Sequence, residues 1–137
     1  MKTGALSFKG EKILISDTVG FIKNLPHELV ASFRATLSEV KEADLLLIVF
    51  DVSSENLEAE LESVKAVLKR LNSWNKEKIY VGNKVDRLVE GEDERRELYQ
   101  VVAGKIPDEK PEVVFVSAKE GWGIDELKSL IYERLNR

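Results

Sequence analysis

The stretch that decides the fold is ADLLLIVFD, residues 43–51. Between its two Asp residues the apolar side chains follow one another without a polar interruption. A strand with one solvated face would alternate apolar and polar residues, whereas a strand of a parallel sheet that is buried on both faces reads as a continuous apolar run. The sequence therefore predicts a buried strand here, with helices above and below it.

Strands and helices alternate on the carboxyl side of this stretch. We expect a helix that Ser53 or Ser54 caps and whose apolar stripe consists of Leu57, Leu61, Val64, Leu68 and Leu71. The pattern then predicts a strand at 78–81, a helix around 95–102, a strand at 113–116 and a helix from about 123 to 135. This alternation indicates an α/β sheet with helices on both faces.

On the amino side, the pattern predicts a hairpin followed by a helix. Residues 5–16 form two extended segments around the turn Lys9-Gly10-Glu11. Pro26 occupies a position typical of a first helical residue, and apolar residues recur at helical spacing up to about Lys41.

Length and composition favour one compact domain spanning residues 1–137, with 43% hydrophobic and 34% charged residues. The net charge of −4 argues against a generic basic surface for nucleic acid, so an RNA partner would have to be recognised locally. The absence of cysteine excludes disulfides and thiolate metal sites, and no apolar run reaches the length of a membrane span. We expect a soluble, cytoplasmic chain.

Three short motifs follow three predicted strands, where ligands bind in open α/β sheets. The first is Asp17-Thr18-Val19-Gly20. The Asp17 carboxylate can hold Mg²⁺ through water, and Gly20 lets its backbone N–H approach a terminal phosphate. Taken alone, the same four residues also fit an Asp-initiated turn before a helix.

The second motif is Asn83-Lys84-Val85-Asp86. Asp86 can accept hydrogen bonds from guanine N1–H and the exocyclic amine, a donor pair that adenine lacks. Asn83 offers an amide that ties loops together, and the Lys84 stem can lie over one face of the base. The alternative is a solvated turn.

The third motif, Ser117-Ala118-Lys119, would bring the Ala118 backbone N–H near the guanine carbonyl oxygen, with Ser117 bracing the loop. In isolation it also fits a polar loop that leads to a helix. Because the motifs occur in this order and each follows a strand, we interpret them together as a guanine-nucleotide site.

The residues around the first motif resemble one family. DTVGFI at 17–22, followed by LPHELVASFRATL at 25–37, resembles the second switch region of HflX GTPases. The other two motifs fall where that family has its guanine-recognition elements, and GIDEL at 123–127 is similar to the usual last helix of small GTPase domains. The resemblance implies a Ras-like G domain that takes GTP or GDP with Mg²⁺ and associates with the large ribosomal subunit.

Two departures from the family pattern concern hydrolysis. No G-x-x-x-x-G-K-[ST] phosphate loop occurs in the 137 residues, because Gly104-Lys105 is followed by Ile106. Phe21 occupies the position where many Ras relatives have a water-orienting Gln, and the HflX family likewise has an apolar residue there. His27 is nearby, but a lone His in a first helical turn is more often a surface residue, so no catalytic residue is assigned.

In a Ras-like sheet the phosphate loop follows the central first strand, so the resemblance implies a domain without that strand, its loop and its first helix. We expect the two flanking strands either to close the gap directly, to pair with another chain through self-association, or to leave the fold marginally stable. We also expect weak nucleotide affinity and little hydrolysis. The alternatives are a non-enzymatic interaction module that uses the helix at 26–41, and a second chain that supplies the phosphate loop in trans.

Overall fold

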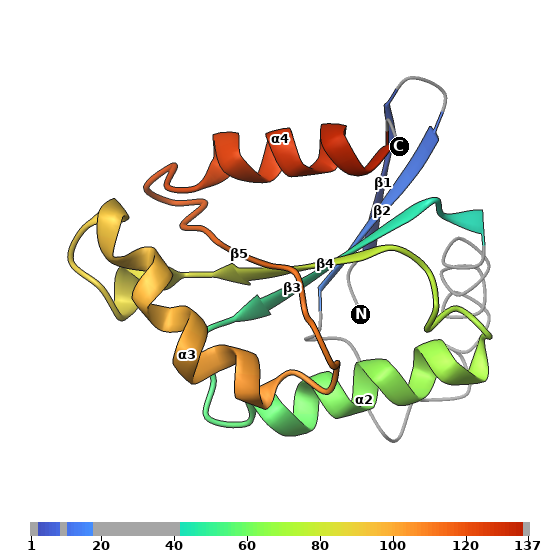
Figure 1. Ribbon diagram of the computed structural model, residues 1–137, viewed down its shortest axis with the longest axis horizontal. Coiled ribbons are helices and arrows are strands. Elements are labelled where there is room, and N and C mark those ends of the chain that lie inside the picture. Colours follow the sequence, from blue (N-terminus) through green and yellow to red (C-terminus); the bar gives the residue numbers. More distant parts are fainter. Residues whose placement is uncertain (1–2, 9–10, 18–41, 136–137) are drawn as a thin grey trace, which may run out of the picture.

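A computed structural model of the chain describes residues 3–8, 11–17 and 42–135, with side chains from residue 42 onward (Figure 1). The predicted helix at 26–41, the turn at residues 9–10, and Gly20 lie outside the described residues.

The described strands form one sheet in the order β1-β2-β3-β4-β5. β1 and β2 pair antiparallel as the predicted hairpin, and each later neighbour pairs in parallel. The strands are β1 (Thr3–Phe8), β2 (Glu11–Asp17), β3 (Leu45–Asp51), β4 (Lys78–Asn83) and β5 (Val113–Phe115). Because β2 to β5 run the same way, their carboxyl ends meet at one edge.

β2 pairs directly with β3, in a register that runs from Ile13 opposite Leu45 to Asp17 opposite Val49. Of the three alternatives expected from the sequence for these two strands, the described residues show direct pairing. The backbone groups that would otherwise be open between these strands take part in a ladder.

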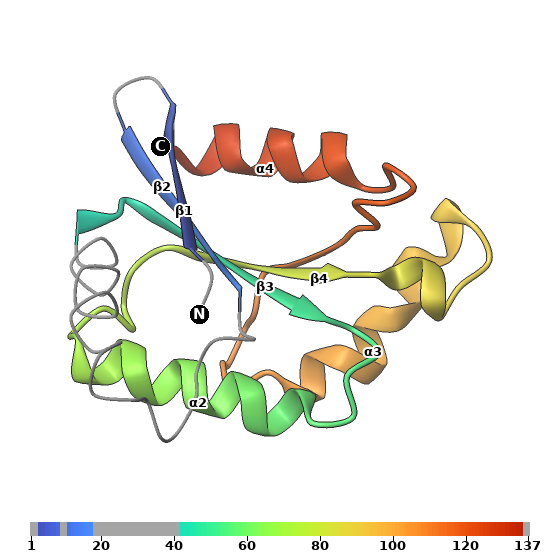
Figure 2. The same ribbon diagram turned by 180° about the vertical axis from the view of Figure 1, so that it is seen from behind.

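Helices cover both faces of the sheet, as the sequence predicts (Figures 1 and 2). On one face, α2 (Leu57–Arg70) buries Leu57, Leu61, Val64 and Leu68 against the sheet. On the opposite face lies α4 (Ile124–Leu135), whose partly buried apolar residues are Ile124, Leu127, Leu130, Ile131 and Leu135. Each helix has an apolar stripe at helical spacing that matches one apolar face of the sheet.

Successive residues of β3 belong to these two cores in turn. Leu46, Ile48 and Phe50 pack in the cluster of α2, whereas Leu45 and Leu47 pack in the cluster of α4. All of them are at most 2% exposed. This alternation is the pleat of a strand buried on both faces, and it confirms the interpretation of residues 43–51.

One local prediction was wrong. Neither Ser53 nor Ser54 is the N-cap of α2; the N-cap is Asn56, and the Ser54 hydroxyl instead accepts the Asn56 N–H and donates to Glu60.

The helix expected around 95–102 is present, and much of it is 3₁₀. It consists of η4 (Glu92–Leu98), the single α-turn α3 (Tyr99–Val102) and η5 (Ala103–Lys105).

Among the helices of the described residues, none combines the length and apolar character that crossing a membrane requires.

The buried face of β3 makes a testable contribution to stability. Ile48→Val removes one methylene from a residue that is 1% exposed, so we expect the free energy of unfolding to fall by about 1 kcal/mol. Val101→Ala, at a position 62% exposed, should change it by less than about 0.5 kcal/mol. Urea denaturation of both variants checks this. Equal losses would contradict the assignment of Ile48 to the core.

Candidate functional site

The second and third motifs lie side by side at the carboxyl edge of the sheet. Asn83 is the last residue of β4, and Ser117 follows shortly after β5. β4 and β5 are neighbours, so the parallel topology brings together two motifs that are far apart in the chain.

Two side-chain hydrogen bonds join these motifs. Ser117 Oγ donates to Asp86 Oδ1 at 2.8 Å, and the Ala118 N–H donates to Asn83 Oδ1 at 3.1 Å. Asp86 and Asn83 of the second motif are thus each held by one residue of the third motif. The carboxylate of Asp86 is fixed through Oδ1 and is half-buried.

A left-handed turn at Lys84 gives the second motif its shape. Lys84 has φ 66° and ψ 31°, a region that residues other than glycine seldom adopt. The next residue, Val85, is fully buried, and its N–H donates to Val116 O at 3.3 Å. The turn therefore inserts Val85 into the core, leaves Lys84 exposed and brings Asp86 back toward Ser117.

Ser117 is the centre of the third motif and is fully buried. Its hydroxyl accepts the Glu120 N–H at 3.1 Å while donating to Asp86, so both roles of the hydroxyl are used. Its backbone N–H and carbonyl pair with Trp122 as an isolated bridge. These bonds close the loop at both of its ends.

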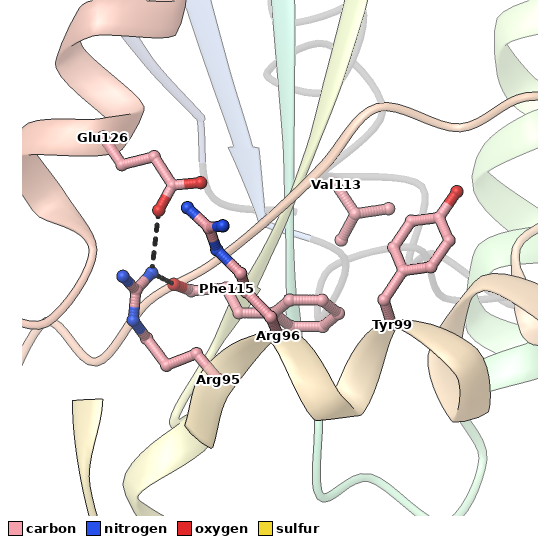
Figure 3. A pocket seen from close by; sticks show the side chains of 6 residues that line it. All are labelled: Arg95, Arg96, Tyr99, Val113, Phe115 and Glu126. Carbon is pink, nitrogen blue, oxygen red and sulfur yellow. Dashed lines mark hydrogen bonds and ion pairs between the residues drawn. The ribbon is translucent and has the colours of Figure 1, made fainter. Parts of the chain in front are cut away.

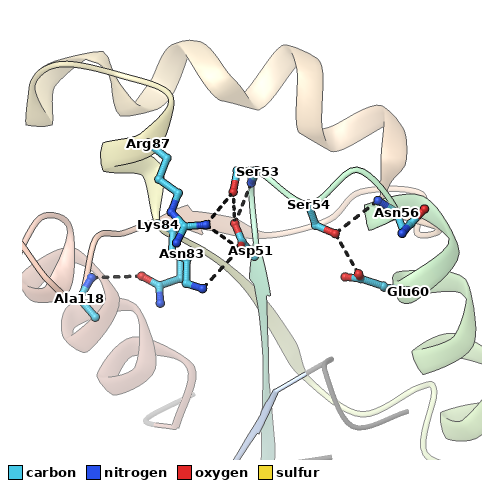
Figure 4. A network of polar contacts seen from close by, with 9 residues as sticks. All are labelled: Asp51, Ser53, Ser54, Asn56, Glu60, Asn83, Lys84, Arg87 and Ala118. Atoms are coloured by element: carbon cyan, nitrogen blue, oxygen red, sulfur yellow. Dashed lines mark hydrogen bonds and ion pairs between the residues drawn. The ribbon is translucent and has the colours of Figure 1, made fainter. Parts of the chain in front are cut away.

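Sequence reasoning missed Asp51, which lies at the end of β3 opposite Asn83 (Figure 4). Asp51 Oδ1 accepts hydrogen bonds from the Ser53 N–H at 2.9 Å and the Ser53 hydroxyl at 2.6 Å. Asp51 Oδ2 lies 3.4 Å from Lys84 Nζ and 3.5 Å from an Arg87 nitrogen. The signal in the sequence was an acidic residue at the end of the buried strand.

These contacts set the ionisation of Asp51. Partial burial would raise its pKa, but the two hydrogen bonds from Ser53 and the ammonium of Lys84 outweigh burial, and the pKa lies below the ordinary value. Asp51 is therefore a carboxylate at neutral pH, with a fixed orientation.

The remaining predicted residues are less closely assembled. Asp17 ends β2 at the same edge of the sheet. The structure describes its backbone but not its side chain, and Gly20 lies outside the described residues. Lys119 and Ala118 are exposed. Within the part of the chain whose side chains are described, no group of three or more His, Cys, Asp or Glu residues is placed to hold a metal ion.

A separate cavity of about 260 Å³ lies between η4, β5 and α4, and none of the predicted site residues lines it (Figure 3). Arg95 crosses one side of it, donating to Phe115 O at 2.7 Å and to Glu126 Oε2 at 3.1 Å. The Glu92 carboxylate accepts the Gly123 N–H at 3.2 Å. These bonds attach η4 to the residues on either side of the third motif, and they therefore restrain the loop that contains it.

The chain is similar in sequence and in fold to known GTPases. A family model described as "50S ribosome-binding GTPase" matches residues 1–84, more than half of the chain. The chain belongs to this family. The segment that matches the 50S ribosome-binding GTPase family ends within the second motif, at Lys84.

Among curated proteins, the chain is 41% identical over 128 residues to the GTPase HflX of Magnetococcus marinus, covering 93% of the chain and 27% of that relative. It is 38% identical over 127 residues to the GTPase HflX of Escherichia coli strain K12, covering 93% and 28%. The HflX resemblance is thus confirmed. The chain spans about a quarter of the length of these relatives.

Solved structures show the same fold. A GTP-binding protein from the hyperthermophilic archaeon Sulfolobus solfataricus, in complex with GDP, superimposes with a TM-score of 0.65 at 29% identity, covering 97% of this chain and 43% of that one. Era in complex with MgGDPNP and a segment of 16S ribosomal RNA matches with a TM-score of 0.63, but at 22% identity the likeness concerns the fold alone.

Two glycines beside the third motif provide a matched test of its geometry. Gly121 and Gly123 both have positive φ, 78° and 74°. A Cβ at Gly121 would meet nothing within 4 Å, whereas one at Gly123 would lie 2.4 Å from Phe115 O and 2.5 Å from Arg95. We expect Gly121→Ala to lower the free energy of unfolding by about 1 kcal/mol and Gly123→Ala by at least about twice that amount. Urea denaturation measures both, and equal losses would contradict the packing at Gly123.

Proposed function

We propose that this chain binds GTP or GDP by reading the guanine base with Asn83, Asp86 and the Ser117-Ala118 loop. The observation that carries the proposal is the pair of bonds that joins the two loops: Ser117 to Asp86 at 2.8 Å and Ala118 to Asn83 at 3.1 Å. The recognition groups are therefore held in place by the protein itself, so less conformational entropy is lost when a base binds.

Asp86 is the residue that we expect to select guanine. Guanine N1–H and its exocyclic amine form a donor pair that fits one carboxylate, and adenine would leave that carboxylate without a partner. The bond from Ser117 uses Asp86 Oδ1, and a carboxylate oxygen has two lone pairs, so both oxygens can accept from the base.

Ala118 requires a change to fulfil its predicted role. Its N–H is donated to Asn83 Oδ1, so it can meet the guanine carbonyl oxygen only as a shared donor or after release from Asn83. Lys84 and Lys119 are both exposed, and their stems are available to cover the faces of the base.

For the phosphate side, we propose that Asp17 contributes to binding Mg²⁺ and that the Gly20 N–H contacts a terminal phosphate. Mg²⁺ commonly takes one or two protein carboxylates and completes its shell with phosphates and water, so a single Asp at the end of β2 fits this cation. The metal would supply charge neutralisation between the phosphates, and Asp17 would orient it.

Hydrolysis by the 137-residue polypeptide should be weak. Phosphoryl transfer depends on positioning and charge stabilisation by the backbone N–H groups and lysine of a phosphate loop, and that motif does not occur in this sequence. The likeness to GTPase HflX supports GTP hydrolysis as the activity of the family, and this polypeptide as a domain that reads the base.

We further propose the large ribosomal subunit as a partner, in the cytoplasm, which the description of the matching family supports. The alternative is a non-enzymatic interaction module derived from a G domain, in which residues 26–41 contact the ribosome or another protein. Nucleotide titration separates the two, since only the first requires guanine-selective binding.

Binding can be tested with fluorescent GDP in the presence of Mg²⁺. We expect saturable binding that unlabelled GDP displaces and ATP does not, and a loss of at least about tenfold in affinity for Asp86→Ala, because a charged hydrogen-bond acceptor is removed. Asp93→Ala, an exposed carboxylate away from the site, should bind as wild type does. Binding that Asp86→Ala leaves intact would overturn the proposed base site.

Hydrolysis can be tested separately by phosphate release from GTP. We expect turnover by the purified chain to be at least about tenfold slower than the roughly 4 × 10⁻⁴ s⁻¹ of a Ras-type GTPase that has its phosphate loop and no activating partner. Turnover at or above that rate, lost in Asp86→Ala, would show that the chain positions the phosphates without a phosphate-loop motif.

A further inference from the structure

The carboxylate of Asp51 stands directly beside the base-reading turn without belonging to any of the three motifs. We propose that Asp51 is a positioning residue: by holding Lys84 from the end of β3, it keeps the Asn83–Asp86 turn in its left-handed conformation before nucleotide binds. The expected effect of Asp51 on guanine affinity rests on the proposed function. Its expected effect on the conformation of the turn concerns the nucleotide-free chain and does not.

The geometry shows a carboxylate that is itself held. Ser53 donates to Asp51 Oδ1 through both its N–H and its hydroxyl, which leaves Oδ2 directed at the cations (Figure 4). Lys84 Nζ is 3.4 Å from Oδ2, and Arg87 is 3.5 Å away from the same oxygen. The side chains of Asp51 and Lys84 are 26% and 47% exposed, so water screens the ion pair in part and its contribution is modest.

The backbone explains why Lys84 needs such a contact. A left-handed residue with a Cβ is disfavoured relative to the right-handed conformation, and it persists when its surroundings hold it there. Two backbone bonds flank the turn: Val52 N–H to Asn83 O at 3.1 Å and Val85 N–H to Val116 O at 3.3 Å. The ion pair to Asp51 is the contact that the Lys84 side chain adds to them.

The same ion pair places Lys84 for its role at the base. With its ammonium anchored at Asp51, the methylene stem is restrained, and a restrained stem loses less side-chain entropy when it covers an aromatic face. A shift of the turn would also move Asp86, which follows Lys84 by two residues and must meet the base. Asp51 thus acts on guanine binding through Lys84 without touching the nucleotide.

Arg87 shares the carboxylate and provides an internal comparison. It is exposed, its bond to Oδ2 is long, and it has ordinary right-handed neighbours, so its loss should relax the turn less than the loss of Asp51. Glu55 is the matched charge control, because it is an exposed carboxylate in the loop that follows β3.

The experiment uses the labelled 137-residue chain and the variants Asp51→Asn, Lys84→Met, Arg87→Gln and Glu55→Gln. In the nucleotide-free chain, NMR measures the intraresidue amide–Hα NOE of Lys84, which is strong when φ is positive. We expect this NOE to weaken in Asp51→Asn and Lys84→Met and to persist in Arg87→Gln and Glu55→Gln. Asp51→Glu keeps the negative charge and should therefore retain part of the NOE intensity. If Asp51→Asn fails to fold, Lys84→Met still tests the ion pair from its other side.

Fluorescent GDP titration then tests the consequence. We expect a roughly three- to fivefold weaker affinity for Asp51→Asn, and an Asp51→Asn/Lys84→Met double variant that binds no more weakly than Lys84→Met alone, because both changes remove one interaction. An unchanged NOE together with an affinity equal to that of Glu55→Gln would overturn the inference. Absence of guanine binding by the wild-type chain would refute the proposed function instead, and the NOE alone would then decide whether Asp51 holds the turn.

Discussion

The rest of the structure depends on the burial of β3 on both faces. A strand with apolar side chains on each side is stable only between two layers, and α2 and α4 supply them from segments on either side of β4 and β5. The segments that connect β3 to β4 and β4 to β5 cross from one end of the sheet to the other, so these strands run parallel and their carboxyl ends meet at one edge. The position of the site is therefore a consequence of how the core is buried.

Close packing at that edge extends from the core into the site. Gly82, one residue before Asn83, is buried, and a Cβ there would lie 2.8 Å from Val52 and 2.9 Å from Phe115. The backbone of β4 thus approaches the side chains of its neighbours closely just before the Asn83–Asp86 turn. Val85, fully buried after the left-handed Lys84, anchors the other end of the turn. Asn83 and Lys84 lie between these two closely packed residues, and Asp86 follows Val85 directly, so the backbone of the turn has little freedom to move.

Features that follow from a periodic pattern of residues could be predicted from the sequence, whereas most contacts of individual side chains could not. The double burial of residues 43–51, the helices on both faces and the meeting of two motifs follow from periodicity and strand order. The N-cap of α2 was mispredicted because Ser54 had a competing partner in Glu60, which only the folded loop reveals. The role of Asp51 was missed because its partners Lys84 and Arg87 are distant in the chain. A single carboxylate also forms no sequence motif that would single it out.

The topology also places the residues proposed for base recognition and for phosphate binding on different strands. Asn83, Asp86 and Ser117 are held by β4 and β5 at one side of the sheet, whereas Asp17 ends β2 on the far side of β3. Direct pairing of β2 with β3 places Asp17 opposite Val49, while the bonds between the second and third motifs are made at β4 and β5. Under the proposed function, a chain with poor phosphate contacts can still select guanine, because the contacts proposed for the base and for the phosphates belong to different strands. Affinity and hydrolysis should fall together when phosphate contacts are weak, while selectivity between guanine and adenine persists.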